Sequence, residues 1–258
     1  MRREENVIRW QYEEPEAWKG MQVPIQRRRA DFSISPIPEE AASILDVGCG
    51  EGTVTNRMAV KFPFVVGTDL SATALHRVNA YRVQGSVRHL PFRNASFDAV
   101  TVFEVLEHLP TSLLEDALSE IKKVARRWIV VSVPYRERLW ERMLRCKRCG
   151  TRFHAYGHLT SWSEKRLARL FAPEFELTQV AYLGEESALP NWVYLVNRWL
   201  GNVWGNNGHA VCPCCCERDY YVNDGNIFGY VLSRLIWRAE RLPAFAKPIW
   251  MFGRYQRK

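Results

Sequence analysis

Short apolar runs alternate with amphipathic stretches along most of the chain, and this alternation predicts its elements. The apolar runs predict strands near residues 43–47, 64–69, 83–87, 97–103 and 128–133. The amphipathic stretches predict helices near residues 53–61, 72–81 and 112–125. Strands that alternate with helices are typical of a parallel sheet covered on both faces, so the pattern predicts an α/β fold.

Two helix starts carry the sequence signature of a capping box, in which a serine is followed three residues later by a glutamate. Ser112 and Glu115 form one such pair at the start of the third helix. Ser161 and Glu164 form the other and predict a further helix near residues 162–171. We therefore expect both serines to act as N-caps.

The first predicted strand runs directly into a glycine-rich turn, with glycines at positions 48, 50 and 52. Glycine lets the backbone turn tightly and come close to a ligand. The helix that follows directs its free N–H groups and the positive end of its dipole at this turn. The turn indicates a nucleotide-type cofactor, although dinucleotide-binding folds use a similar element with another glycine spacing.

Asp69 closes the second predicted strand, nineteen positions after Gly50. An acid at this place can accept hydrogen bonds from the ribose hydroxyls of an adenosine. The alternative is that Asp69 only caps the following helix, where Ser71 also offers an N-cap oxygen.

Two more blocks follow in order, Gly85–Phe92 and Ser96–Leu109, and the second contains the segment Glu-x-x-Glu-His-Leu. With them, residues 42–183 resemble the class I S-adenosylmethionine-dependent methyltransferases, in particular the methyltransferase type 11-like group. The resemblance implies a Rossmann-like seven-stranded methyltransferase sheet with helices on both faces. It also implies S-adenosylmethionine as cofactor and methyl transfer as activity.

The same resemblance implies a role for each matching position. Gly48, Cys49 and Gly50 would wrap the methionine part of the cofactor, and Asp46 would fix the loop and contact the amino group. The family usually has an acid after the third-block glycine, where this chain has Ser86. The whole implied cofactor set is Asp46, Gly48, Cys49, Gly50, Asp69, Leu70, Ser86, Val87 and Phe103.

The resemblance also implies which elements the two ends of the chain form. Residues 175–183 are expected to form a sixth strand, and residues 249–255 a final antiparallel strand beside the fifth and sixth. Residues 1–41, with Trp10, Trp18 and the basic run 27–29, would form an N-terminal cap near the substrate opening. The expected domains are this cap, a methyltransferase core at 42–183 with a cysteine knuckle at 146–158, an insertion at 184–248, and a final strand with a basic tail at 249–258.

Six of the seven cysteines lie in two clusters, at 146–149 and 212–216. In a cytosolic chain, Cys-x-x-Cys pairs indicate a metal rather than disulfides, and zinc favours four thiolates in a tetrahedron. The second cluster offers four thiols for the two remaining ligand positions. The alternative to metal binding is that these cysteines are buried, reduced thiols. The preferred structural zinc site consists of Cys146, Cys149, Cys212 and Cys215.

Three histidines are candidates for chemistry. His108 follows Glu107 at the end of the fourth strand, which faces the transferred methyl group in the family that the chain resembles. His158 belongs to a Gly-His segment that recurs near the substrate opening in the same group. His154 is the alternative for completing the metal site. For each histidine, a structural hydrogen-bonding role is as good an interpretation as catalysis.

Amino-acid composition indicates which kinds of partner the protein favours. The 258 residues are 47% hydrophobic and carry a net charge of +8, which favours an anionic partner. Seven basic residues and one acid lie between Arg234 and Lys258, interleaved with Trp237, Phe245, Trp250, Phe252 and Tyr255. This mixture suits a membrane surface or a lipid-phosphate substrate, and a solvated face over a packed aromatic core is an equally good interpretation.

No apolar run is long enough for a transmembrane helix, and we expect a cytoplasmic protein with peripheral membrane contact. The expected acceptor is a small molecule or glycan, such as a lipid-linked saccharide. RNA methylation and a non-catalytic binding module are the alternatives.

Overall fold

The computed structural model describes residues 24–188, 210–221 and 245–258, together with Glu13, Phe228, Val231 and Leu235. The chain divides into two compact units. The first comprises Met1–Glu137, Leu159–Gly184 and Trp250–Lys258, and the second comprises Arg138–His158 and Glu185–Ile249. Trp10 and Trp18, which we assigned to the N-terminal cap, lie outside the described residues.

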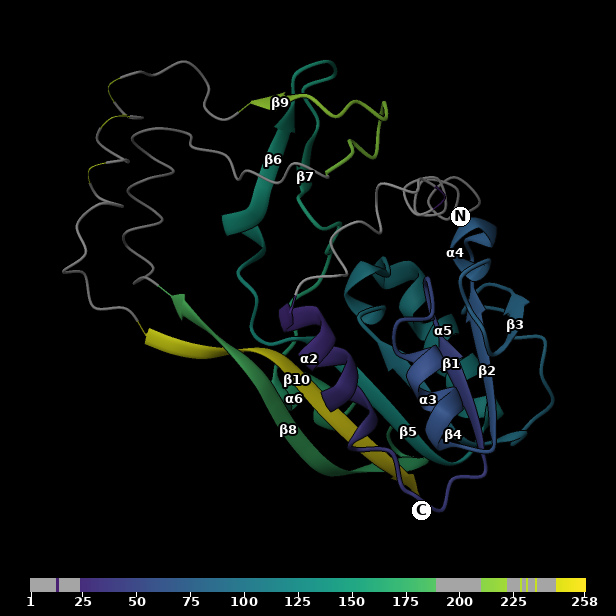
Figure 1. Ribbon diagram of the computed structural model, residues 1–258. Helices are drawn as coiled ribbons and strands as arrows, with labels where there is room; N and C mark the ends of the chain where they lie inside the picture. Colours follow the sequence, from purple (N-terminus) through teal and green to yellow (C-terminus); the bar gives the residue numbers. More distant parts are fainter. Residues whose placement is uncertain are drawn as a thin grey trace. The chain divides into compact units, whose positions relative to one another are not determined.

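A seven-stranded sheet with the order β3-β2-β1-β4-β5-β10-β8 forms the frame of the first unit (Figure 1). Strands β1 to β5 pair in parallel, whereas β10 runs antiparallel to β5. The strands are β1 Ser43–Val47, β2 Phe64–Asp69, β3 Tyr81–Gln84, β4 Phe97–Phe103, β5 Ala125–Pro134, β8 Phe175–Ala188 and β10 Phe245–Arg257. The predicted α/β class and the insertion of the last strand beside the fifth and sixth are confirmed.

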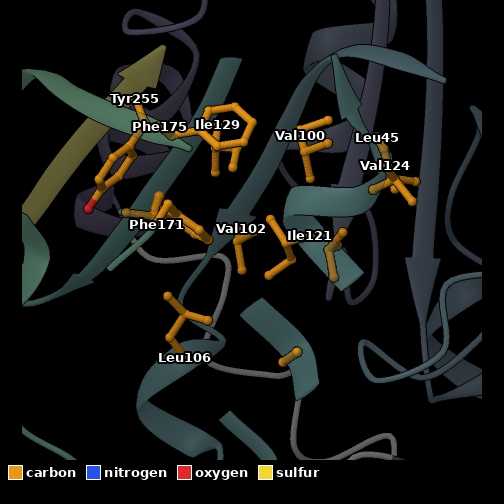
Figure 2. Packing of buried hydrophobic residues seen from close by; sticks show 14 of the residues in the cluster. Leu45, Val100, Val102, Leu106, Ile121, Val124, Ile129, Phe171, Phe175 and Tyr255 are labelled. Carbon is orange, nitrogen blue, oxygen red and sulfur yellow. The ribbon is translucent and has the colours of Figure 1, made fainter. Parts of the chain in front are cut away.

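Each face of this sheet packs against its own apolar cluster, and because successive residues of a strand point to opposite sides, neighbouring residues belong to different clusters. Ile44 belongs to the cluster under α2 (Pro24–Ile34) and α3 (Thr55–Lys61), which Ala30 and Met58 complete. Its neighbour Leu45 belongs to the cluster under α5 (Thr111–Val124) and α6 (Glu164–Ala168). Figure 2 shows part of this second cluster, with Val100, Val102, Ile121, Ile129 and Tyr255 among its labelled side chains.

The region after β2 differs from the prediction. Helix α4 spans only Ala72–Leu75, and β3 already begins at Tyr81, so the expected helix to residue 81 and strand at 83–87 are wrong in extent. The side chain of Asn56 explains the early end. It donates to the carbonyl of Arg77 at 3.1 Å and accepts from the N–H of Asn79 at 2.7 Å. These bonds hold the backbone outside a helical path.

Neither predicted capping box forms. Helix α5 begins after Pro110, whose carbonyl accepts from Leu113 and Leu114, and no side chain caps it. Helix α6 has Ser163 at its N-cap position, also without a side-chain cap. Glu164 does not reach back to the helix start, because its carboxylate accepts from the Tyr135 hydroxyl at 2.7 Å and from Arg136 at 3.0 Å.

The second unit contains a three-stranded antiparallel sheet with the order β7-β6-β9. Its strands are β6 Met143–Cys146, β7 Arg152–His154 and β9 Tyr220–Tyr221. A small core of its own lies against this sheet and contains Leu144, Cys146, Phe153, Ala155, Ala210 and Cys212. Across both units, no helix among the described residues is long and apolar enough to cross a membrane.

Candidate functional site

The glycine-rich turn after β1 is a tight, open backbone loop. Gly48, Gly50 and Gly52 all have positive φ angles, of 71°, 53° and 80°. The N–H groups of Gly48 and Cys49 both donate to the carbonyl of Thr68, at 2.8 and 3.1 Å, which ties the turn to the end of β2. The turn therefore presents main chain rather than side chains at this edge of the sheet.

Asp46 lies in β1, two residues before Gly48, and its carboxylate links this strand to α3 and β4. The side chain is buried and accepts hydrogen bonds from the hydroxyls of Thr55 at 2.6 Å and Thr101 at 2.7 Å. Burial raises the pKa of Asp46 to about 6, even though both hydroxyls favour the charged form. Burial also raises the pKa of the Cys49 thiol, so Cys49 acts as a packing group here rather than a nucleophile.

Asp69 ends β2 with its carboxylate directed at the turn. One oxygen accepts from the N–H of Gly50 at 2.8 Å, and the other accepts from the N–H of Ser71 at 2.8 Å. The hydroxyl of Ser71 itself caps α4 by accepting from Ala74 at 3.0 Å, so Ser71 and not Asp69 is the N-cap. Each Asp69 oxygen retains capacity for a further donor, such as a ribose hydroxyl.

The third predicted block lies beside β2 and β3. The carbonyl of Leu70 accepts from the side chain of Gln84 at 2.9 Å, which links the ends of these two strands. The hydroxyl of Ser86 accepts from the N–H of Arg88 at 3.3 Å. Val87 is partly buried and packs against the main cluster. Leu70 and Ser86 thus have local hydrogen-bonded structure at the positions that the resemblance assigned to the adenine.

The end of β4 carries acidic residues that our sequence analysis did not single out as site residues. Glu104 has a positive φ of 56°, accepts from the Ser132 hydroxyl at 2.7 Å and lies 4.0 Å from the buried guanidinium of Arg29. Glu107, in the short 3-10 helix η2 (Leu106–His108), is fully buried, and neither carboxylate oxygen has a hydrogen-bond partner among the described residues.

Burial and the neighbouring Glu104 raise the pKa of Glu107 well above its ordinary value. The sequence signal for this acidic turn is the Glu-x-x-Glu spacing directly after a buried strand. Phe103, which we expected at the cofactor, packs its side chain into the cluster under α2 and α3. His108 follows Glu107 in η2 and is partly buried.

His154 and His158 lie together in the second unit. Their rings stack with centroids 4.8 Å apart. The Nδ1 atom of His154 accepts from the backbone N–H groups of Tyr156 at 3.3 Å and His158 at 3.1 Å. His154 therefore helps to hold its own turn, and it does not belong to the cysteine cluster that lies in the same unit.

The four cysteines preferred from the sequence meet in the second unit. The sulfurs of Cys146, Cys149, Cys212 and Cys215 all lie within 4.8 Å of one another. The sulfurs of Cys146 and Cys215 are 3.5 Å apart, as are those of Cys149 and Cys212. A tetrahedral Zn–S₄ site with bonds of about 2.3 Å has S–S distances of about 3.8 Å, so the donor set fits this geometry.

Two turns of the same kind present these sulfurs. The N–H of Gly150 donates to the carbonyl of Cys146 at 3.1 Å, and the N–H of Cys216 donates to the carbonyl of Cys212 at 2.9 Å. The side chain of Thr151, 3.2 Å from the sulfur, lowers the pKa of Cys149 to about 6. All seven cysteines are free thiols, and Cys214 and Cys216 are exposed and lie outside the cluster.

Three aromatic residues of the C-terminal tail are core residues. Trp250, Phe252 and Tyr255 are 7%, 1% and 0% exposed. The Tyr255 hydroxyl donates to the carbonyl of Leu167 at 2.6 Å. Because these rings are buried, they do not offer the apolar surface that we expected to meet a membrane. Trp237 lies outside the described residues.

Comparison with known proteins agrees with this arrangement. The family model described as a methyltransferase domain matches residues 45–128. The ubiquinone biosynthesis O-methyltransferase of Xylella fastidiosa is 30% identical over 116 residues, which are 41% of this chain and 47% of that protein. The chain thus spans about half the length of this relative.

Two solved structures share the fold. The magnesium protoporphyrin IX methyltransferase from Synechocystis, with bound SAH, has a TM-score of 0.55 at 15% identity, covering 70% of this chain and 93% of that one. A possible histamine N-methyltransferase from Thermotoga maritima has a TM-score of 0.54 at 14% identity, covering 98% and 99%. Residues 45–128 therefore match the methyltransferase-domain family, and the chain shares its fold with solved methyltransferases.

Proposed function

We propose that this protein transfers the methyl group of S-adenosylmethionine to a small-molecule acceptor. The observation that carries the proposal is the hydrogen-bonded join of the glycine turn and the end of β2, where Asp69 accepts from the N–H of Gly50. The backbone of the glycine turn and the Asp69 carboxylate are therefore neighbours. Binding of an adenosine that carries an amino-acid tail would need both kinds of group, backbone N–H donors and a carboxylate for the ribose. The match of residues 45–128 to a methyltransferase domain supports the same reading.

The turn passes a test of fit. A Cβ on Gly48 would lie 2.3 Å from a methyl carbon of Val105, and a Cβ on Gly67 would lie 2.8 Å from the sulfur of Cys49. The chain therefore approaches itself here more closely than side chains allow, so both positions require glycine. Gly48 to Gly50 would bind the methionine part, Asp46 would hold the loop and face the amino group, and Asp69 would bind the ribose hydroxyls.

The remaining cofactor assignments are part of the same proposal. Leu70 would lie against the adenine. Ser86 and the backbone of Val87 would bind its edge, where the related family has an acid. Phe103 would contribute through its backbone at the end of β4, because its side chain is in the core.

The sulfonium supplies an activated methyl group, so the protein needs chiefly to align the acceptor and, for a hydroxyl acceptor, to take up a proton. His108 stays our predicted base at the end of β4, and His158 stays the predicted base from the second unit. A glycan acceptor, including a lipid-linked saccharide, also remains a prediction. RNA is the alternative acceptor.

We also propose that zinc is a structural cofactor bound by Cys146, Cys149, Cys212 and Cys215. Support comes from four thiol sulfurs within 4.8 Å of one another on two matching turns. Zinc with four thiolates has no open position, so its role would be to cross-link two segments that are 63 residues apart between Cys149 and Cys212.

Calorimetric titration of the purified, zinc-analysed protein with S-adenosylmethionine tests the main proposal. We expect micromolar binding that is weakened at least tenfold by Asp69→Ala, while the exposed-site variant Glu115→Ala binds as wild type does. S-adenosylhomocysteine should compete for the same site. A folded, zinc-replete protein that does not bind S-adenosylmethionine would refute the methyltransferase assignment and favour a non-catalytic binding module.

A further inference from the structure

A groove of about 470 Å³ lies between α5 and the segment that contains α6. Thr111, Leu114 and Leu118 line it from α5, and their spacing of three and four residues places them on one face of that helix. Side chains between Ser163 and Leu170 form the other side. All of these residues belong to the first unit, so the groove lies within one compact part of the chain.

The floor of the groove is apolar. Leu114 is buried, and Leu118 and Leu170 are partly buried and pack against the main core cluster. These three leucines come from both sides of the groove. Their remaining exposed surface is therefore available to apolar side chains that enter from outside.

The rim of the groove is cationic. Lys165, Arg166 and Arg169 line it, against the single acid Glu115. Lys165 and Arg169 are exposed and four residues apart, and like charges at this spacing oppose helix formation. Among the residues that the structure describes, neither of these two forms an ion pair. An anionic partner would relieve this repulsion.

The third cation is held beside the groove, and the neighbouring acids are engaged elsewhere. The guanidinium of Arg166 lies over the Trp162 ring, 4.0 Å from its centroid. Glu164 accepts from the Tyr135 hydroxyl at 2.7 Å, and Asp116 accepts from an arginine at 2.9 Å. The residues that line the groove therefore keep an excess of positive charge.

We propose that this groove, called here the α5–α6 groove (Leu114, Leu118, Leu170, Lys165, Arg166 and Arg169), binds a short, acidic amphipathic helix of a partner protein. Residues 111–118 extend over about 10 Å, enough for about two helical turns of the partner. Apolar side chains at positions i, i+3 or i+4, and i+7 of the partner would lie on the leucines, and acidic side chains beside them would pair with the rim. This interaction goes beyond the proposed methyl transfer, because it needs neither cofactor nor acceptor.

A membrane surface or a single lipid is the less fitting occupant. Peripheral membrane binding requires apolar side chains that project into the bilayer, whereas these leucines form the floor of a groove. A lipid carries its charge in one head group. The cations from Lys165 to Arg169 are spread over about 6 Å of helix axis, which matches acidic residues at i and i+4 of a peptide.

Fluorescence anisotropy tests the proposal on the full-length, zinc-replete protein. The probe is a labelled helical peptide of about 14 residues, with leucine at i, i+3, i+4 and i+7 and glutamate at most other positions. Lys165→Glu with Arg169→Glu should weaken its binding at least tenfold, and this double variant should instead bind the peptide in which lysines replace the glutamates. Arg93→Glu, which reverses an exposed charge away from the groove, should bind the glutamate peptide as wild type does.

Methyl NMR locates the peptide, because its binding should shift the signals of Leu114, Leu118 and Leu170 and leave Leu45 unchanged. Equal melting temperatures of the variants and wild type verify that the fold is retained. No binding of the glutamate peptide to wild type, equal binding of both peptides, or wild-type binding by the double variant would overturn the proposal. Tighter binding to anionic vesicles would assign the groove to lipid, and a dimer that only the double variant loses would assign it to a second copy. None of these outcomes affects the methyltransferase assignment, which rests on binding of S-adenosylmethionine.

Discussion

Gly48 and Val105 are packed so closely that the glycine-rich turn after β1 and the end of β4 form one fixed structure. A Cβ on Gly48 would lie 2.3 Å from Cγ2 of Val105, and the φ of Gly48 is +71°. Space and backbone conformation thus both require glycine at this position. The contact also joins the turn to the acidic segment that begins at Glu104.

We predict that Gly48→Ala lowers the free energy of unfolding by about 1–3 kcal/mol, through overpacking and backbone strain. It should also abolish measurable binding of S-adenosylmethionine. Adding Val105→Ala to Gly48→Ala should restore only the part due to the clash, because the strain at positive φ remains. Urea unfolding of the two single variants and the double variant measures the coupling. Strictly additive effects would show that the clash does not govern the turn.

The sequence was sufficient for the strands that are buried on both faces. The bounds of β1, β2 and β4 agree with the prediction, because each is a short, mostly apolar run that is followed by a polar or glycine-rich turn. Helix α4 was predicted too long because its end depends on Asn56, twenty-one positions before the carbonyl of Arg77 that it binds. Such a tertiary contact leaves no local signal.

The candidate site likewise contains residues that the sequence predicted and residues that it did not. Paired cysteines in two short turns carry enough local information to name a candidate ligand set, and the structure brings those four sulfurs together. The role of Glu107 could not be read from the sequence. Its unusual state results from full burial next to Glu104 and Glu137, which only the folded chain produces. The two capping boxes did not form because α5 already begins at Thr111, which puts Ser112 inside the helix, and because the Glu164 carboxylate accepts from the Tyr135 hydroxyl.

Asp46 should make cofactor binding dependent on pH. Its pKa is raised to about 6 by burial, so below pH 6 the carboxylate is increasingly protonated and loses its attraction for a cationic amino group. We predict that the Kd for S-adenosylmethionine rises as pH falls, approaching tenfold per unit below pH 6. Asp46→Asn should bind weakly at every pH and show a flat profile. Calorimetry between pH 5 and 8 provides the comparison, and parallel profiles for the two proteins would contradict it.

Glu107 should make the fold less stable as pH rises. Its folded pKa lies well above the ordinary value of 4.5, so the folded state keeps a proton that the unfolded state releases. Stability from this group is complete below about pH 4.5 and is lost as pH rises through the folded pKa. Glu107→Gln should flatten the fall in unfolding free energy between pH 5 and 8.

Thermal and urea unfolding of wild type and Glu107→Gln across this range measures the difference. Glu115→Gln, which changes an exposed glutamate on α5, is the matched control and should follow wild type. If Glu107→Gln also follows wild type, the buried carboxylate does not control the pH dependence of stability.

Adjacent cysteines offer a test of the zinc site with an internal control. Cys215 belongs to the cluster of four sulfurs, whereas its neighbour Cys214 is exposed and outside it. We predict that the purified protein holds one zinc per chain, that Cys215→Ser loses it, and that Cys214→Ser keeps it. Cobalt substitution should give the intense thiolate-to-metal absorption and tetrahedral d–d bands of a Co–S₄ centre in wild type and Cys214→Ser only.

Removal of the metal should affect the two units differently. The turn Cys146–Gly150 follows β6, the turn Cys212–Cys216 precedes β9, and their sulfurs form the cluster. Structural zinc sites supply folding free energy directly. A strong chelator should therefore increase hydrogen exchange in residues 143–154 and 210–221, while β1, β4 and β5 remain protected. If the exchange rates of residues 143–154 and 210–221 do not change when zinc is removed, the thiols hold their arrangement without metal. The cluster would then be a packed set of reduced cysteines.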